Sequence, residues 1–202
     1  MADNVLTQIC FTDNVQCSKE KISEIKKEFH FESGFYFDSI LNKSNSAFKE
    51  SAAGIVLMRD LLIRLGARPS HIIIRRNSDG RPCICGNGYD FNISHSEGFV
   101  LCGAIKGGII GCDIQAERYI ASEKRDRLIR RFMNDEEILK YEEEADKSGF
   151  YFSAWSKKEA VIKCFGGSVW NDMKELSGKG VSSSVVSDGE RRAFWAMCHQ
   201  FY

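Results

Sequence analysis

The feature that most constrains this chain is an aspartate, Asp113, inside the apolar run Ile109–Ile114. Burying an unpaired carboxylate costs several kcal/mol, so the fold must give Asp113 an ion pair, hydrogen bonds or a metal ion. A second acid lies in a helical pattern, where Trp155, Glu159 and Lys163 fall one turn apart on one face. Taken singly, each acid is best interpreted as part of a salt bridge. Together, with basic residues nearby, they indicate a divalent metal held against a phosphorylated ligand.

Composition limits the remaining possibilities. The 202 residues are 43% apolar and 28% charged, which is ordinary for a globular protein with one core or two small subdomains. The net charge of zero gives no reason to expect binding to nucleic acid or to a membrane surface. Neither a signal peptide nor a membrane-spanning run is recognisable, and the first residues read as a cytosolic start, so we expect a cytoplasmic protein.

The eight cysteines are scattered, several of them in apolar runs, and their spacing favours free thiols in a reducing compartment. Cys83 and Cys85 are close together in the sequence, but the sequence has no second closely spaced pair of cysteines that could complete a zinc site with them. A zinc-dependent interaction module that uses Cys83, Cys85 and His95 is a less favoured alternative.

Local patterns predict the secondary structure of the first part of the chain. Apolar alternation and capping residues predict a strand, two helices and a second strand, at Val5–Phe11, from Ser18 to about Phe31, from Ser46 to about Leu65, and at His71–Arg76. Gly66 is expected to end the second helix.

The later part of the chain predicts strands, then helices, then a closing hairpin. Gly107 and Gly108 separate the runs Phe99–Ile105 and Ile109–Ile114, which predicts a hairpin. Further along we expect a capping box with Asn134 and Glu137, a helix at Phe150–Phe165 stopped by Gly166-Gly167, and paired strands at Val181–Val186 and Arg191–Phe201. This order indicates two α+β halves, residues 1–106 and residues 107–202, the second of which carries the acids.

Other phosphate-binding and hydrolytic signatures are absent from the sequence. The segment Ser94-His95-Ser96 is not a serine-hydrolase site, because adjacent Ser and His side chains do not normally form a nucleophile–base pair and no Gly-x-Ser-x-Gly elbow is present. There is no Walker-type loop and no Rossmann fingerprint.

Four segments in a fixed order resemble the 4'-phosphopantetheinyl transferase superfamily, specifically its larger monomeric type that activates peptide synthetases such as the surfactin one. They are Gly80-Arg81-Pro82 after the turn residue Asp79, Asn92-Ile93-Ser94-His95-Ser96, Gly111-Cys112-Asp113-Ile114-Gln115, and Trp155-Ser156-Lys157-Lys158-Glu159-Ala160-Val161-Ile162-Lys163. The match covers roughly residues 79 to 167. Each motif is modest by itself, but four in the family order are a specific signal.

The resemblance implies an α+β fold, a pseudo-dimer of two similar halves with the active site in the cleft between them. It implies transfer of the phosphopantetheine arm of coenzyme A to a serine of an apo acyl or peptidyl carrier protein, with release of adenosine 3',5'-bisphosphate. The protein would act as a monomer with Mg²⁺ or Mn²⁺.

The resemblance also implies roles for individual residues. Asp113, Gln115 and Glu159 would hold the metal, and Asp113, Glu159 and Lys163 would be catalytic, with Glu159 as the base. Further residues would bind coenzyme A, namely Arg81, Pro82, Ser94, His95, Lys158 and Lys163. Lys49 is a weaker candidate for this role.

Two departures from the family pattern motivate a second hypothesis, which ranks below the enzyme because Asp113, Glu159 and Lys163 are all present. Gln115 stands where the family usually has a third acid, which predicts weaker metal affinity, and the sequence after Cys198 is shorter than is common. The alternative is therefore a degenerate member that binds coenzyme A or a carrier without catalysis. A carrier is usually acidic, and Arg64, Arg68, Arg75 and Arg76 are candidates for a basic docking patch, although solvated arginines are the default interpretation.

Overall fold

A computed structural model describes residues 4–15, 17–31, 35–78, 80–166, 174, 176 and 180–202. The expected turn residue Asp79 and helix-stop residue Gly167 lie outside the described residues. The chain divides into two compact units, Met1–Ile110 with Gln200–Tyr202, and Gly111–His199. Helices and sheets occur in both units, so the predicted α+β class is confirmed. The expected pseudo-dimer, with halves at residues 1–106 and 107–202, stays a prediction.

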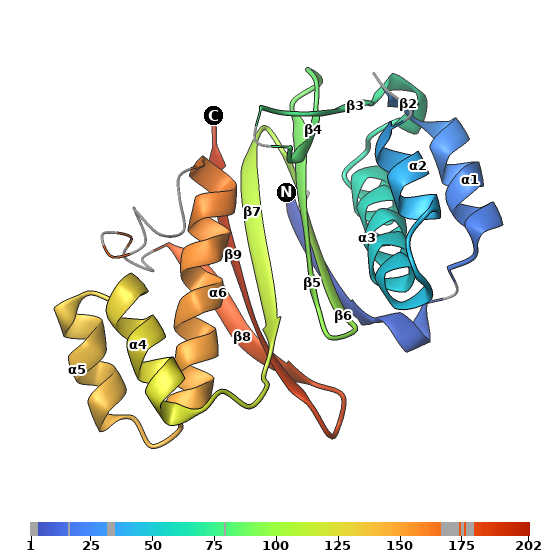
Figure 1. The fold of residues 1–202 in the computed structure, drawn as a ribbon. Helices are drawn as coiled ribbons and strands as arrows, with labels where there is room; N and C mark the ends of the chain where they lie inside the picture. Colours follow the sequence, from blue (N-terminus) through green and yellow to red (C-terminus); the bar gives the residue numbers. More distant parts are fainter. Residues whose placement is uncertain are drawn as a thin grey trace. The chain divides into compact units, whose positions relative to one another are not determined.

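In the first unit one long helix, α3, packs on one face of an antiparallel sheet, and two further helices pack against α3 (Figure 1). The sheet has the order β1-β6-β5, and the helices are α1, α2 and α3. Their bounds are Val5–Phe11 for β1, Tyr89–Ser96 for β5, Phe99–Lys106 for β6, Lys19–Glu28 for α1, Phe35–Leu41 for α2 and Asn45–Arg64 for α3. A smaller sheet contains β2 (His30–Phe31), β3 (Ile73–Arg76) and β4 (Pro82–Ile84) in the order β2-β3-β4.

Several local predictions are confirmed in this unit. Ser18 caps α1, because its side chain accepts a hydrogen bond from the Lys21 amide. The helix ends at Glu28, earlier than expected, because Phe29 is extended and His30 pairs with Ile73 of β3. The helix α3 buries its apolar stripe in the core, and Gly66, at φ 86°, follows its end. Short 3₁₀ turns at Thr12–Asn14 and Pro69–His71 follow β1 and precede β3.

The hairpin expected at Gly107-Gly108 is wrong. β6 is the central strand of its sheet, with antiparallel partners β1 and β5 on its two edges. The strand after the glycines, β7 (Gly108–Ala116), belongs to a different sheet of order β7-β9-β8. Both edges of β6 are already paired, so its backbone has no free edge for β7. The hairpin that does form joins β5 to β6 at Glu97-Gly98.

In the second unit α6 packs along this third sheet, and α4 and α5 lie against α6 (Figure 1). The bounds are Ser122–Phe132 for α4, Asp135–Glu143 for α5, Lys147–Phe165 for α6, Val181–Ser187 for β8 and Arg192–Phe201 for β9. The closing hairpin β8–β9 and the Asn134–Glu137 capping box are both confirmed. No described helix combines the length and apolar character needed to cross a bilayer.

Candidate active site

Gly111 sets how closely β7 and α6 approach each other in the second unit. A Cβ atom at this position would overlap the Ala160 carbonyl oxygen and the Cys164 amide nitrogen of α6. The overlap is with helix backbone, so it cannot be relieved by a side-chain rotation. Side chains two residues apart share one face of a strand, so Asp113 projects from the same face of β7 as Gly111. The glycine of the Gly-x-Asp motif therefore lets Asp113 reach the helix.

Asp113 is bound on both of its carboxylate oxygens. The ammonium of Lys163, on α6, donates to Oδ1 at 2.5 Å, and the side-chain amide of Gln115 donates to Oδ2 at 2.9 Å. Asp113 is 1% exposed. The ion pair and the amide donor thus supply the compensation that the sequence requires for a buried carboxylate.

Glu159 lies on α6, half-buried, one helical turn before Lys163. Burial raises the pKa of Glu159 above the ordinary range of a glutamate, the Lys163 charge opposes this rise, and the Asp113 carboxylate adds to it. Burial alone would lower the pKa of Lys163, but its attraction to Asp113 outweighs burial, and the pKa is raised. The three side chains are therefore electrostatically coupled, and the charged lysine is attracted to both acids.

This donor set suits a hard cation such as Mg²⁺. Asp113 and Glu159 provide carboxylate oxygens and Gln115 an amide oxygen, and Mg²⁺ is usually bound by one or two carboxylates together with water and substrate phosphates. In the present arrangement Gln115 directs its N–H to Asp113, so ligation by Gln115 requires its amide to rotate. Within the described residues no three His, Cys, Asp or Glu side chains form a group that could hold a metal, and this includes Cys83, Cys85 and His95.

Lys158, which is expected to contact coenzyme A, makes its observed contacts within the protein. It is 1% exposed, and its ammonium donates to the Phe132 carbonyl at 3.0 Å and to Glu137 Oε2 at 2.7 Å. These bonds tie α6 to the end of α4 and to the capping box of α5. They favour a structural role, and the role in coenzyme A binding stays a prediction.

The expected coenzyme A residues Arg81, Pro82, Ser94 and His95 all lie in the first unit, where Pro82 and His95 line a pocket of about 220 Å³. Sequence reasoning missed Lys43 in this pocket and gave Arg76 a different role. Lys43 precedes α3 and Arg76 lies on β3, so no single sequence motif links either residue to His95. The Lys43 ammonium donates to Ser51, also in the pocket lining, at 2.7 Å. Three basic side chains around one small pocket suit an anionic ligand.

Arg81 is engaged with the protein itself in this structure. Its Nη2 lies 3.0 Å from Asp90 Oδ2, 3.0 Å from the Phe91 carbonyl and 2.7 Å from the Ile110 carbonyl. Ser94 is buried in β5. The Nδ1 atom of His95 lies 2.8 Å from Glu50 Oε2, with the imidazole 39% exposed.

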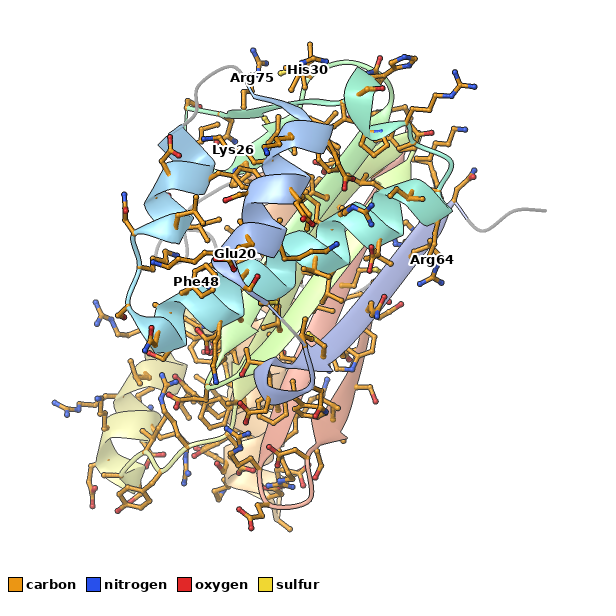
Figure 2. The ribbon with its side chains drawn as sticks, turned by 90° about the vertical axis from the view of Figure 1, so that its right-hand side faces the viewer. Glu20, Lys26, His30, Phe48, Arg64 and Arg75 are labelled. Carbon is orange, nitrogen blue, oxygen red and sulfur yellow. The ribbon has the colours of Figure 1, made fainter. Side chains whose placement is uncertain are left out.

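The two weaker sequence expectations for basic residues are placed as follows. The ammonium of Lys49 lies 3.6 Å from Asp13, in an exposed pair. The arginines considered for docking do not form one patch: Arg64 ends α3, whereas Arg75 lies near His30 of β2, well apart from it (Figure 2).

The fold and these contacts define an α+β protein whose second unit carries a coupled carboxylate–lysine site. Residues 109–198 match the model of the 4'-phosphopantetheinyl transferase superfamily. This region contains Asp113, Glu159 and Lys163. The family resemblance found in the sequence motifs is confirmed: this region of the chain is similar to that superfamily.

Three curated relatives are also similar to the chain. The 4'-phosphopantetheinyl transferase gsp of Aneurinibacillus migulanus is 32% identical over 121 residues, covering 57% of this chain and 48% of the relative. The 4'-phosphopantetheinyl transferase psf-1 of Bacillus pumilus is 29% identical over 143 residues, covering 69% and 54%. The 4'-phosphopantetheinyl transferase HetI of Nostoc sp. is 29% identical over 121 residues, covering 56% and 50%. The chain thus spans about half the length of the curated relatives it matches.

Proposed function

We infer that the chain transfers the phosphopantetheine arm of coenzyme A to a serine of an apo carrier protein. The observation that carries this proposal is the coupled set Asp113, Glu159 and Lys163 inside the region that matches the superfamily. The basic pocket of the first unit supports it, because Lys43, Arg76 and His95 suit the phosphate groups of coenzyme A.

The reaction requires a proton acceptor and stabilisation of phosphate charge. The serine Oγ forms a bond to the phosphorus next to the pantetheine arm, and the bond from that phosphorus to adenosine 3',5'-bisphosphate breaks. Glu159 takes the serine proton as the general base. In the ligand-free protein, burial raises the pKa of this carboxyl group. Lys163 is charged and stabilises the negative charge that accumulates on the phosphate oxygens.

A divalent cation belongs to this proposal. Asp113 and Glu159 would hold it, with Gln115 contributing after rotation of its amide. When bound, Mg²⁺ supplies neutralisation of the pyrophosphate charge. Lys163 now occupies Oδ1 of Asp113, so cation binding requires that Asp113 share this oxygen or that Lys163 turn toward the substrate phosphates.

The proposal also covers the protein's partner, its location in the cell and its oligomeric state. The partner is an acyl or peptidyl carrier protein, and the protein acts as a cytoplasmic monomer. The degenerate alternative, binding without transfer, is less favoured because Asp113, Glu159 and Lys163 are all present and coupled.

The direct test mixes the chain with coenzyme A, Mg²⁺ and a panel of apo carriers, and measures the intact mass of each carrier. We expect at least one carrier to gain one phosphopantetheine group. The matched variants are Glu159→Gln, which should abolish the gain, and Glu136→Gln, an exposed control on α5 that should retain it. Coenzyme A binding without a mass gain on any carrier would favour the degenerate alternative instead.

A further inference from the structure

Glu50, which lies outside the recognised motifs, connects α3 to the strand that carries His95. Its Oε1 accepts a hydrogen bond of 2.7 Å from the Gly98 amide in the β5–β6 turn. Its Oε2 lies 2.8 Å from Nδ1 of His95. The side chain of Glu50 is 20% exposed. Both carboxylate oxygens are therefore committed to one short segment of the chain, the end of β5 and the turn that follows it.

This contact determines where the imidazole proton lies. A ring nitrogen and a carboxylate oxygen at 2.8 Å would repel each other through their lone pairs unless the nitrogen carries hydrogen. In the neutral imidazole, hydrogen on Nδ1 leaves Nε2 with a lone pair. Nε2 lies on the side of the ring away from Glu50, and His95 lines the basic pocket. A lone pair on Nε2 would repel a phosphate oxygen, so the phosphate binds Nε2 favourably only when this nitrogen has gained a proton.

We propose that Glu50 is a positioning residue for phosphate recognition: it keeps a proton on Nδ1 of His95, so that a phosphate group of coenzyme A binds Nε2 together with a proton from solvent. This inference rests on the proposed function. The imidazolium then lies between two anions, the Glu50 carboxylate and the phosphate, each of which stabilises its charge.

The other charged groups around His95 do not replace this role. Lys43, before α3, and Arg76, on β3, line the same pocket and are cations already, so they take up no proton when a phosphate binds. Glu97 follows β5 in the exposed turn. Uptake of a proton on ligand binding is therefore assigned to His95.

The informative variant is Glu50→Gln. The glutamine carbonyl can still accept from the Gly98 amide, so the turn keeps its hydrogen bond. The glutamine N–H group then faces Nδ1, which becomes an acceptor, and the imidazole proton moves to Nε2. A neutral Nε2–H can donate to a phosphate without taking up a proton. The variant therefore changes proton coupling, whereas a purely structural role of Glu50 would leave it unchanged.

The first measurement uses the full chain without ligand. The ¹⁵N chemical shifts of the His95 ring, recorded at about pH 8 where imidazoles are normally neutral, distinguish the two tautomers. We expect hydrogen on Nδ1 in the native chain and on Nε2 in Glu50→Gln. Hydrogen on Nε2 in the native chain would overturn the inference, whatever the protein's activity.

The second measurement is calorimetric titration with coenzyme A at about pH 8, where phosphate monoesters are fully ionised, in two buffers of different ionisation enthalpy. The native chain and the exposed control Glu24→Gln should take up a proton on binding. Glu50→Gln should take up at most about half as much, and His95→Gln should take up none at this group. Equal uptake by the native chain and by Glu50→Gln would overturn the inference.

The two measurements also separate this inference from the proposed function. A native chain that has the Nδ1 tautomer but binds no coenzyme A contradicts the proposed function, and phosphate recognition by His95 with it. A native chain that binds coenzyme A without proton uptake contradicts the inference alone. Thermal melts of each variant identify any that fails to fold, and the tautomer of the native chain then decides the outcome.

Discussion

Lys158 and Lys163 lie on the same helix but make different contacts. Lys158 holds α6 to α4 and α5, and substitution of Lys158 by methionine tests this structural role. In Lys158→Met the stem stays apolar but the ammonium is lost, together with its bonds to the Phe132 carbonyl and to Glu137. A hydrogen bond to a charged group contributes about 1.5–3 kcal/mol. Removing one partner of a fully buried ion pair costs about 3–5 kcal/mol.

The second figure must be reduced here, because the Glu137 side chain is 23% exposed and regains some hydration. Methionine also keeps the packing of the lysine stem. We therefore expect Lys158→Met to lower the free energy of unfolding by roughly 2–4 kcal/mol, which for a chain of this size is a fall in Tm of roughly 5–15 °C. Urea unfolding followed by circular dichroism measures the first quantity, and a thermal melt measures the second.

The control is Lys157→Met, at the neighbouring half-buried lysine, for which no ion pair is found within the described residues. It should change the free energy of unfolding by less than about 0.5 kcal/mol. Coenzyme A affinity, measured well below the Tm, should be the same within about twofold in both variants, a difference of less than 0.5 kcal/mol. A Lys158→Met variant of native stability whose coenzyme A affinity falls tenfold would refute this reasoning and restore Lys158 as a ligand contact.

Three further predictions concern the coupled carboxylate–lysine site and the contact between β7 and α6 that supports it. The raised pKa of Glu159 means that its ionised form destabilises the folded state, so Glu159→Gln should be more stable than the native chain at neutral pH. This gain in stability should shrink as the pH falls through the folded-state pKa of Glu159 and vanish below about pH 4. Urea unfolding at several pH values measures it, and a gain that grows on acidification would contradict the prediction. Gln115→Glu should lower the Mg²⁺ concentration for half-maximal activity because it adds a carboxylate, and an unchanged or higher value in a Mg²⁺ titration would count against ligation at this position. Gly111→Ala should lower the free energy of unfolding by at least about 2 kcal/mol and abolish transfer, because a methyl group there meets the backbone of α6; a fully stable variant in urea unfolding would show that the approach of β7 to α6 is not limiting.

The sequence predicted well those features that short-range signals determine. The capping box at Asn134 and the cap at Ser18 depend on residues within four positions, and both form as expected. The need to compensate Asp113 was also evident, because a carboxylate in an apolar run has few permitted environments. The structure identifies the compensating groups as Lys163 and Gln115.

Long-range pairing was less predictable. The glycines Gly107 and Gly108 signal a turn, but they do not show that β6 is already paired on both edges. The helix α4 was missed because most of its residues are charged and its apolar residues, Leu128, Ile129 and Phe132, all lie in its second half. Lys43 in the basic pocket comes from a connection between helices, and sequence spacing could not associate it with His95.

The two lysines of α6 show a related limit of sequence patterns. Lys158 and Lys163 both belong to the family-like motif, and the motif alone does not show which face of the helix each neighbour covers. The structure separates them: Lys158 joins α6 to α4 and α5, whereas Lys163 meets Asp113 on β7. The roles of the two lysines could be told apart only from the positions of α4, α5 and β7.

The most direct test of the account is the rate at which Asp113→Asn modifies a carrier that the native chain accepts, followed by intact mass in the presence of coenzyme A and Mg²⁺. Asparagine keeps the shape of the side chain and can accept a hydrogen bond from Lys163, but it removes the buried negative charge. We expect phosphopantetheine incorporation to be at least about a hundredfold slower, a loss of roughly 2.7 kcal/mol in transition-state stabilisation. Incorporation at the native rate would contradict the assignment of the catalytic site to Asp113, Glu159 and Lys163.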